Sequence, residues 1–184
     1  MKSVLIPLTQ GCEELEAVTI IDLMRRAQFE VTTAGLELQL TPIKASRGTT
    51  LLPDTSLDQA LKTDYDMLVL PGGLPGADHL NDDPRVIKLI QKMAVENKYT
   101  CAICAAPRAL ARAGVLHGKR ATSYPGTLDQ MEISDMTYTG EAVTIDGKII
   151  TGRGPGVAID FTLALIKALG GDKLKQQVET PLLR

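Results

Sequence analysis

Short apolar runs alternate with amphipathic segments along most of the chain. The runs predict buried strands, because parallel strands covered on both faces are apolar without a break. They lie at Val4–Leu8, at Phe29–Leu36, at Tyr65–Leu70 and at the start of the stretch Tyr99–Leu110. Between the first two, apolar residues at positions 17, 20, 21, 24 and 27 have the spacing of one helix face. Strands that alternate with helices in this way predict an α/β fold.

The rest of the chain continues the alternation. Asp146-Gly147 is a strong two-residue turn signal and predicts a hairpin over Ala142–Thr151. Helices are expected after Asp83-Pro84, after Pro107, over Val157–Leu169 up to Gly170-Gly171, and over Asp172–Val178. Smaller elements are expected as a ribbon over Leu38–Leu52, a short helix near Ser56-Leu57-Asp58, a strand over Arg120–Tyr124 and a short helix near Leu128–Ile133. We therefore expect residues 1–184 to form a single domain with a doubly wound, mostly parallel, flavodoxin-like sheet flanked by helices, plus a small β-hairpin addition.

Charge and cysteine content narrow the classes of partner. The chain has 22 acidic and 20 basic residues and a net charge of -2, which gives no reason to expect specific nucleic-acid binding or an anionic membrane as partner. No long apolar segment follows the Met1-Lys2-Ser3 start, so neither a signal peptide nor a membrane span is expected. Three cysteines, an odd number, favour free thiols in a reducing compartment and a cytoplasmic protein.

Cys104 is the strongest candidate for chemistry. It lies where the strand run turns into the helix that begins at Pro107, between the small residues Ala102 and Ala106. A thiol near a helix N-terminus is favoured as a thiolate, and small neighbours permit the tight turn of a nucleophile elbow. The bland alternative is a buried, inert cysteine. Cys101 and Cys104 also spell Cys-x-x-Cys, but we disfavour a redox pair because residues three apart on a strand point to opposite faces. Zinc is disfavoured too, because no second ligand pair has the required spacing.

Two further loops should meet Cys104 at the carboxyl ends of the strands. Glu13 and Glu14 are accounted for by compensation of the helix dipole, whereas Glu16 leads onto the apolar face, where burial would raise the pKa of its carboxyl. The loop Pro71–Gly76 lacks the spacing of a dinucleotide-binding loop, so we expect it to expose a backbone N–H, such as that of Gly73, as an oxyanion donor. No cofactor and no metal are expected.

Five ordered motifs extend the argument beyond single residues. They are Gly11-Cys-Glu-Glu-Leu-Glu16, Asp22-Leu-Met-Arg-Arg26, Val69-Leu-Pro-Gly-Gly73, Ala102-Ile-Cys-Ala-Ala-Pro107 and Thr151-Gly-Arg-Gly-Pro-Gly156. With them the chain resembles, nearly end to end, the ThiJ/PfpI superfamily, in the branch of the parkinsonism-associated deglycase (DJ-one) and its bacterial relatives.

The resemblance implies roles for individual residues. Cys104 would be the reactive cysteine, Glu16 its protonated partner, and Gly73 a backbone oxyanion contributor. Apart from the resemblance, we expect the N–H of Ala105 to join Gly73 in holding an oxyanion. It also implies a homodimer. The candidates for the pocket or the dimer interface are Arg26, Arg47, Tyr124, Arg153 and Pro155.

The chain departs from the superfamily's pattern near the cysteine. Many relatives have a histidine at the end of the segment Thr122–Pro125, and this chain has Tyr124 there. The protease-like branch has a histidine directly after the cysteine, where this chain has Ala105, and no histidine and acid stand two residues apart as in amidotransferases. The two histidines, His79 and His117, fall at an expected loop-helix junction and a surface turn, where solvated structural roles are expected. Protease and amidotransferase activities are therefore disfavoured.

Two functions use the same residues. The first is an enzyme that acts on reactive dicarbonyls, as a glutathione-independent glyoxalase (glyoxalase III) or a protein deglycase, in carbonyl and oxidative stress. Its partner would be a small aldehyde or dicarbonyl, or a glycated protein or nucleotide. The second is a non-enzymatic redox sensor or stress chaperone that works by oxidation of Cys104. We favour the enzyme.

Overall fold

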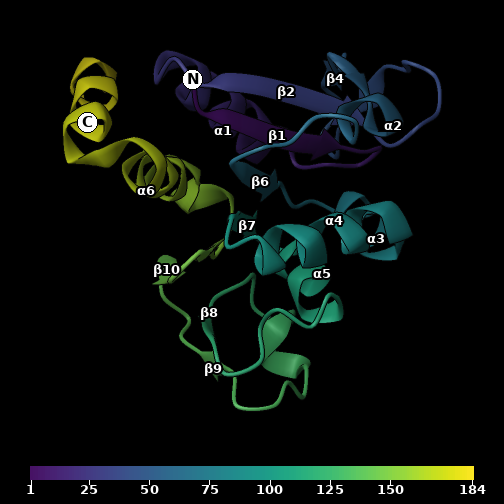
Figure 1. Ribbon diagram of the computed structural model, residues 1–184, viewed down its shortest axis with the longest axis vertical. Helices are drawn as coiled ribbons and strands as arrows, with labels where there is room; N and C mark the ends of the chain where they lie inside the picture. The colour runs from purple at the N-terminus through teal and green to yellow at the C-terminus, as the bar shows by residue number, and fades with distance from the viewer.

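A seven-stranded sheet occupies the centre of the computed structural model, which describes residues 1–184 (Figure 1). The strand order is β10-β11-β7-β6-β1-β2-β5. The strands are β1 (Ser3–Leu8), β2 (Glu30–Gly35), β5 (Thr55–Ser56), β6 (Met67–Leu70), β7 (Tyr99–Ile103), β10 (Val143–Asp146) and β11 (Ile149–Gly152). All neighbours pair in parallel except β10 and β11. The expected doubly wound, mostly parallel fold is confirmed, and its hairpin forms one edge of the main sheet.

Helices cover both faces of the sheet. They are α1 (Glu14–Arg26), α2 (Leu57–Ala60), α3 (Gly76–Asp82), α4 (Pro84–Val95), α5 (Pro107–Arg112) and α6 (Ala158–Glu179), and α6 is interrupted at Gly171. Val4, Ile6 and Leu8 of β1 pack with α1 and α6, whereas Leu5 packs on the other face with α2, α4 and α5. The period of two along a buried strand divides the apolar residues between two cores.

Several sequence-based predictions need correction. The strand expected over Arg120–Tyr124 is only β8 (Arg120–Ala121), which pairs with β9 (Thr137–Tyr138) outside the main sheet. The short helix expected up to Ile133 is a 3-10 turn over Leu128–Gln130. Both α3 and β5 were missed. The ribbon is present as β3 (Ile43–Lys44) and β4 (Thr50–Leu51), and two more 3-10 turns lie at Pro155–Val157 and Thr180–Leu182.

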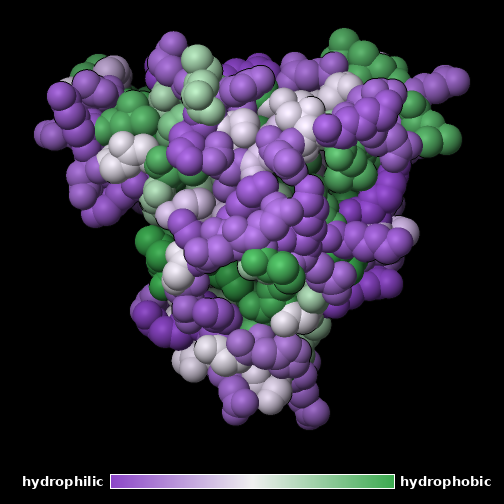
Figure 2. All heavy atoms as spheres, viewed as in Figure 1, coloured by the Kyte–Doolittle hydropathy of each residue, from purple (hydrophilic) through white to green (hydrophobic).

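The surface agrees with burial of the apolar residues on the two faces of the sheet. Hydrophilic residues cover most of the face in Figure 2, and the hydrophobic ones form separate patches. None of the helices combines the length and the apolar character that crossing a membrane requires.

Candidate active site

Three adjacent strands bring the predicted residues together at one edge of the sheet. β7, β6 and β1 are neighbours, and the loop after each contributes one part of the site. Glu16 lies in the first turn of α1, after β1, while Gly73 follows β6 and Cys104 follows β7. Parallel strands end at the same edge, so residues far apart in the sequence meet there.

Cys104 lies at a sharp backbone turn between β7 and α5. Its φ of 62° is in the left-handed region, which non-glycine residues rarely adopt. Hydrogen bonds hold the turn on both sides: the Cys104 N–H donates to Gly152 O (2.9 Å), and Cys104 O accepts from the Tyr124 N–H (2.8 Å). The residue is 8% exposed, and the backbone N–H groups of Gly73 and Ala105 lie close enough to the thiol to lower its pKa. The predicted turn is present, and the sulfur has a narrow opening to solvent.

Glu16 is a buried carboxyl in contact with the Cys104 side chain. Its Oε2 accepts from the Gly72 N–H at 2.8 Å, whereas Oε1 is buried without a hydrogen-bond partner. Burial raises the pKa of Glu16 to about 7, against the lowering effect of the Gly72 N–H and the Cys104 thiol. When Glu16 is neutral, Oε1 can carry the proton and act as a hydrogen-bond donor to a bound ligand.

Gly72 permits this contact because it has no side chain. A Cβ on Gly72 would lie 2.6 Å from the Cys104 Cβ and 2.9 Å from Glu16 Oε2. Both distances are shorter than real Cβ contacts. Gly72, the first glycine of the Pro71–Gly76 loop, therefore places only backbone atoms beside the Glu16 carboxyl and the Cys104 side chain.

The electrostatics of the thiol differ from the sequence-based expectation. Burial, followed by the Glu16 carboxylate, raises the pKa of Cys104 to about 12, although the N–H groups of Gly73 and Ala105 lower it. The predicted helix-terminus thiolate is therefore wrong for the state with ionised Glu16, because desolvation and a neighbouring negative charge exceed the effect of the N–H donors. The two groups are better treated as a pair that loses its first proton near pH 7.

A cavity of about 460 Å³ opens over Cys104. Of the five candidates for the pocket or interface, Arg47, Tyr124 and Pro155 line this cavity. Arg26 does not: it pairs with Asp22 on the exposed side of α1 at 2.7 Å. Arg153 lines a neighbouring cavity of about 260 Å³ that shares Tyr124 and Pro155 with the first. Arg26 and Arg153 thus stay predictions for the dimer interface only.

Sequence reasoning missed the structural role of Glu14. Its carboxylate accepts from the Arg47 N–H (3.0 Å), the Thr49 N–H (3.3 Å) and the Ser46 hydroxyl (3.2 Å). Burial raises the pKa of Glu14, but its own backbone N–H and these three donors together outweigh that effect and lower the pKa to about 2. Dipole compensation alone does not describe this residue, because Glu14 holds the turn that carries Arg47. The turn predicted at Ser46-Arg47-Gly48 was the only feature of the sequence that could have indicated this role, because a tight turn needs acceptors for its backbone N–H groups.

Sequence reasoning also missed Arg108 at the cavity and placed His79 in the wrong element. Arg108 lines the cavity and forms an ion pair with Asp78 of α3, and its place one turn after Cys104 was the signal for it. His79 is exposed on α3, where its Nδ1 contacts Thr9 Oγ1 (2.9 Å) and Gln10 O (3.2 Å). It ties α3 to the loop after β1. The exposure agrees with the predicted solvated role, but the residue lies within a helix and not at a loop-helix junction. His117 is exposed in a turn.

The cysteines and acids elsewhere form no second reactive cluster. Cys12, Cys101 and Cys104 are all free. Cys101 and Cys104 pack in the same apolar core, contrary to the expectation of opposite faces, because the strand ends at Ile103. No group of three or more His, Cys, Asp or Glu residues could hold a metal ion.

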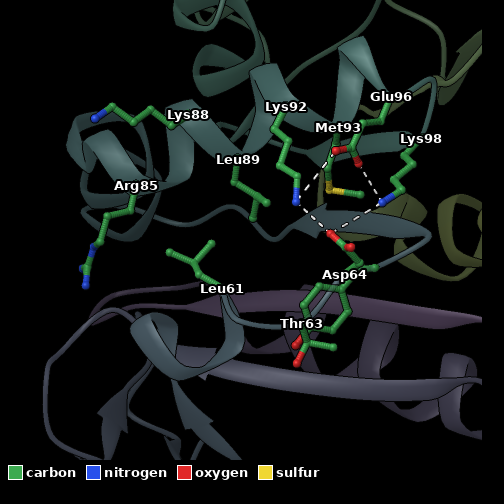
Figure 3. Close-up of a pocket in the computed structure, with 11 residues that line it drawn as sticks. Leu61, Thr63, Asp64, Arg85, Lys88, Leu89, Lys92, Met93, Glu96 and Lys98 are labelled. Carbon is green, nitrogen blue, oxygen red and sulfur yellow. Dashed lines mark hydrogen bonds and ion pairs between the residues drawn. The ribbon is translucent and has the colours of Figure 1, made fainter.

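A cavity of about 240 Å³ between α4 and residues 61–65 offers a contrast (Figure 3). The Asp64 carboxylate lies 2.7 Å from Lys92 Nζ and 3.8 Å from Lys98 Nζ, and Glu96 pairs with the same two lysines. The lining contains no cysteine and no histidine. We therefore assign the candidate site to the Cys104 cavity.

Known proteins resemble this chain over nearly its whole length. Residues 2–168 match the model of the DJ-1/PfpI family. The chain is 39% identical to the Parkinson disease protein 7 homolog of Danio rerio, over 99% of this chain and 97% of that one. It is 30% identical to a glutathione-independent glyoxalase, DJR-1.2, of Caenorhabditis elegans, over 98% and 96% of the two chains. The crystal structure of Drosophila melanogaster DJ-1beta superimposes with a TM-score of 0.93 at 39% identity, covering 99% of this chain and 97% of that one.

The raised pKa of Glu16 makes stability depend on pH. Glu16 loses its proton near pH 4.5 when unfolded and near pH 7 when folded. Between these values the folded state binds more protons, so the free energy of unfolding falls as pH rises, by about 2 to 3 kcal/mol from this group. We expect Glu16→Gln to lose this component in urea unfolding at about pH 5 and about pH 8. The exposed control Glu37→Gln should keep it, and an equal pH dependence in wild type and Glu16→Gln would contradict the assignment.

Proposed function

Because the chain belongs to the DJ-1/PfpI family, we propose that it is a cysteine-dependent enzyme that acts on reactive dicarbonyls, of the glutathione-independent glyoxalase or protein deglycase type. The observation that carries the proposal is the buried Glu16 carboxyl, with one unpartnered oxygen, in contact with Cys104. A relative named as a glyoxalase supports it. Neither group alone would suffice, since the chemistry needs a nucleophile and a proton carrier together.

The first step is addition of the sulfur to an aldehyde. The pKa of Glu16 lies below that of Cys104, so the pair that has lost one proton carries its charge mainly on the Glu16 carboxylate. This carboxylate takes the proton of the thiol, and the thiolate that forms lies close to the Gly73 and Ala105 N–H groups. The sulfur forms a bond to the aldehyde carbon, and the carbonyl electron pair moves to oxygen. The same two N–H groups are then placed to stabilise that oxyanion, and Glu16 gives it a proton, which completes a hemithioacetal.

The second step moves a proton between the two carbons of the substrate. Glu16, now a carboxylate, takes the proton from the former aldehyde carbon and returns it to the neighbouring carbon through an enediol. The product is a thioester of a 2-hydroxy acid, which water hydrolyses to regenerate the thiol. On an aminocarbinol or hemithioacetal adduct of a dicarbonyl, the hydroxyl of the adduct gives up its proton, and the amine or thiol leaves with a proton. The aldehyde that this regenerates then follows the same sequence, and the net reaction is deglycation.

No histidine lies in the cavity, so Glu16 is the acid-base group of this proposal. Tyr124, in place of the histidine of many relatives, lines the cavity and donates its backbone N–H to Cys104 O. Its contribution is to hold the nucleophile's turn.

We also propose that the chain forms a homodimer through the outer face of α1. Leu15 and Val18 on this helix and Leu52 beside β4 are 52%, 45% and 65% exposed. Val18 and Leu52 also line one shallow cavity. Apolar side chains grouped on one surface favour burial against a second copy.

Redox sensing is the second candidate function, because the same geometry would stabilise oxidised Cys104. Peroxide would convert the thiolate to a sulfinate through a sulfenic acid, with reduction of two peroxide molecules to water. A protonated Glu16 Oε1 could then donate to a sulfinate oxygen, which would hinder further oxidation.

Loss of the thiol should abolish dicarbonyl turnover. We expect Cys104→Ala to reduce methylglyoxal consumption by at least about 100-fold, measured in amine-free buffer beside Cys104→Ser and Glu16→Gln. In wild type, kcat/KM should rise with pH through about 7, because the pair must lose one proton before a thiolate forms. In Glu16→Gln this acid limb should move to higher pH, because only the buried thiol can still ionise. Unchanged turnover in Cys104→Ala would contradict the proposal.

The dimer proposal predicts that a charge on α1 separates the subunits. We expect sedimentation equilibrium to show wild type as a dimer and Val18→Glu as a monomer, since an unpaired carboxylate is costly in an apolar interface. The matched control is Val95→Glu, at an 88% exposed position on α4, which should stay dimeric. A monomeric wild type would refute the interface.

Peroxide titration tests the sensor. Intact mass should show a gain of two oxygens at Cys104 before any change at the buried Cys12 and Cys101, and Glu16→Gln should proceed further, to three oxygens. If Cys104 shows no selective gain, sensing by this residue is excluded.

A further inference from the structure

Arg47 has the one charged side chain of the Cys104 cavity that is not already occupied by another group. Three charged side chains line this cavity: Glu13, Arg47 and Arg108. Arg108 is paired with Asp78, and Glu13 accepts from the Glu16 N–H at 2.7 Å as the cap of α1. The Arg47 guanidinium makes no ion pair, and its single hydrogen bond is a long one, from Nη1 to Ser46 O at 3.4 Å. Most of its donors are therefore free at the wall of the cavity that Cys104 also lines.

The backbone of Arg47 is fixed although its guanidinium is free. Glu14 accepts the Arg47 N–H with both carboxylate oxygens, at 3.0 Å each, and binds Ser46 and Thr49 on either side. The Ser46 N–H donates to Cys12 O at 2.8 Å, which ties the same turn to the loop after β1. The side chain thus starts from a defined point on the cavity wall, as a recognition group requires.

We propose that Arg47 is a specificity-determining residue that binds a carboxylate or phosphate group of the substrate, and that Glu14 is the positioning residue that holds Arg47 at the cavity. The preferred substrates are then anionic 2-oxoaldehydes, in place of neutral methylglyoxal. This substrate class rests on the proposed function, whereas binding of an anion next to Cys104 does not.

Geometry and chemistry support this substrate class. A guanidinium presents a planar fork of donors that matches two oxygens of a carboxylate or phosphate. The cavity, at about 460 Å³, lies within the range of sites that hold ligands much larger than a three-carbon aldehyde. A ligand with its aldehyde at Cys104 therefore has room for an anionic group that reaches Arg47.

A pair of alkylating reagents tests the anion site without any turnover. Iodoacetamide is neutral and iodoacetate is its anionic counterpart, and with both the sulfur forms a bond to carbon as iodide leaves. The measurement is the ratio of the two rates at Cys104, followed by intact mass and peptide mapping. Arg47→Met should lower the iodoacetate-to-iodoacetamide ratio about tenfold, and Arg47→Lys should lower it less.

The iodoacetate-to-iodoacetamide ratio also distinguishes a positioning role of Glu14 from general damage to the fold. Glu14→Gln should lower it by a smaller factor than Arg47→Met, because the turn keeps one acceptor, while a structural fault would change both rates alike. Arg112→Met, on α5 and paired with Asp82 outside the cavity, is the matched control and should leave the ratio unchanged. Added salt should reduce the wild-type ratio towards that of Arg47→Met.

Competition and turnover then identify the anion and the substrate. Protection from iodoacetate by inorganic phosphate but not acetate assigns the site to phosphate, and the reverse assigns it to carboxylate. Wild type should consume a phosphate-bearing or carboxylate-bearing 2-oxoaldehyde with a higher kcat/KM than methylglyoxal, and Arg47→Met should lose this preference about tenfold. A normal alkylation ratio with no turnover of any dicarbonyl would overturn the proposed function and leave the anion site standing. Equal ratios in wild type and Arg47→Met would overturn the anion site itself.

Discussion

The contact between the Glu16 carboxyl and the Cys104 thiol is the interaction on which the rest of the site depends. Each group alone would be poorly placed, since the carboxyl is buried with one unpartnered oxygen and the thiol is mostly removed from water. Together they lose one proton near neutral pH, and the charge that remains lies mainly on Glu16, whose Oε2 accepts from the Gly72 N–H. The desolvation free energy of burying two titratable groups is limited because only one of them is ionised at a time.

The fold makes this contact possible by adjacency of strands. β1, β6 and β7 lie side by side, so three loops supply the acid, the N–H donor and the nucleophile within one small space. Gly72 keeps the space small, since a methyl group there would overlap both reacting side chains. Glu14 adds a fourth segment by holding the 46–49 turn, and so gives the cavity a wall that the sheet alone does not provide.

Much of this arrangement could be predicted from the sequence, and the exceptions have physical causes. The apolar runs and the turn signal at Asp146-Gly147 were local and strong enough to predict the sheet, and strand ends then predicted that Glu16 and Cys104 would meet. The strand at Arg120–Tyr124 was overestimated because Tyr124 gives its N–H to Cys104 O and not to a strand partner. The helix α3 was missed because its polar residues Asp78, His79 and Asn81 obscure the helical period.

The pKa of Cys104 and the role of Glu14 could not be predicted in the same way. A pKa depends on desolvation and on every charge nearby, and neither quantity is written in local sequence. The sequence set Glu16 apart from Glu13 and Glu14 but gave the latter two the same role. In the structure Glu13 caps α1, whereas Glu14 holds the 46–49 turn. Only the positions of distant segments distinguish these two carboxyls.

The left-handed backbone at Cys104 has a consequence for how the sulfur behaves during a reaction. A non-glycine residue held at a φ of 62° stores of order 1 kcal/mol of conformational energy, which persists only where the surroundings permit no alternative. Here Gly152 and Tyr124 clamp the peptide from both sides. Bond formation at the sulfur therefore begins from an atom whose location is already settled, so little of the activation barrier goes into rearranging the protein.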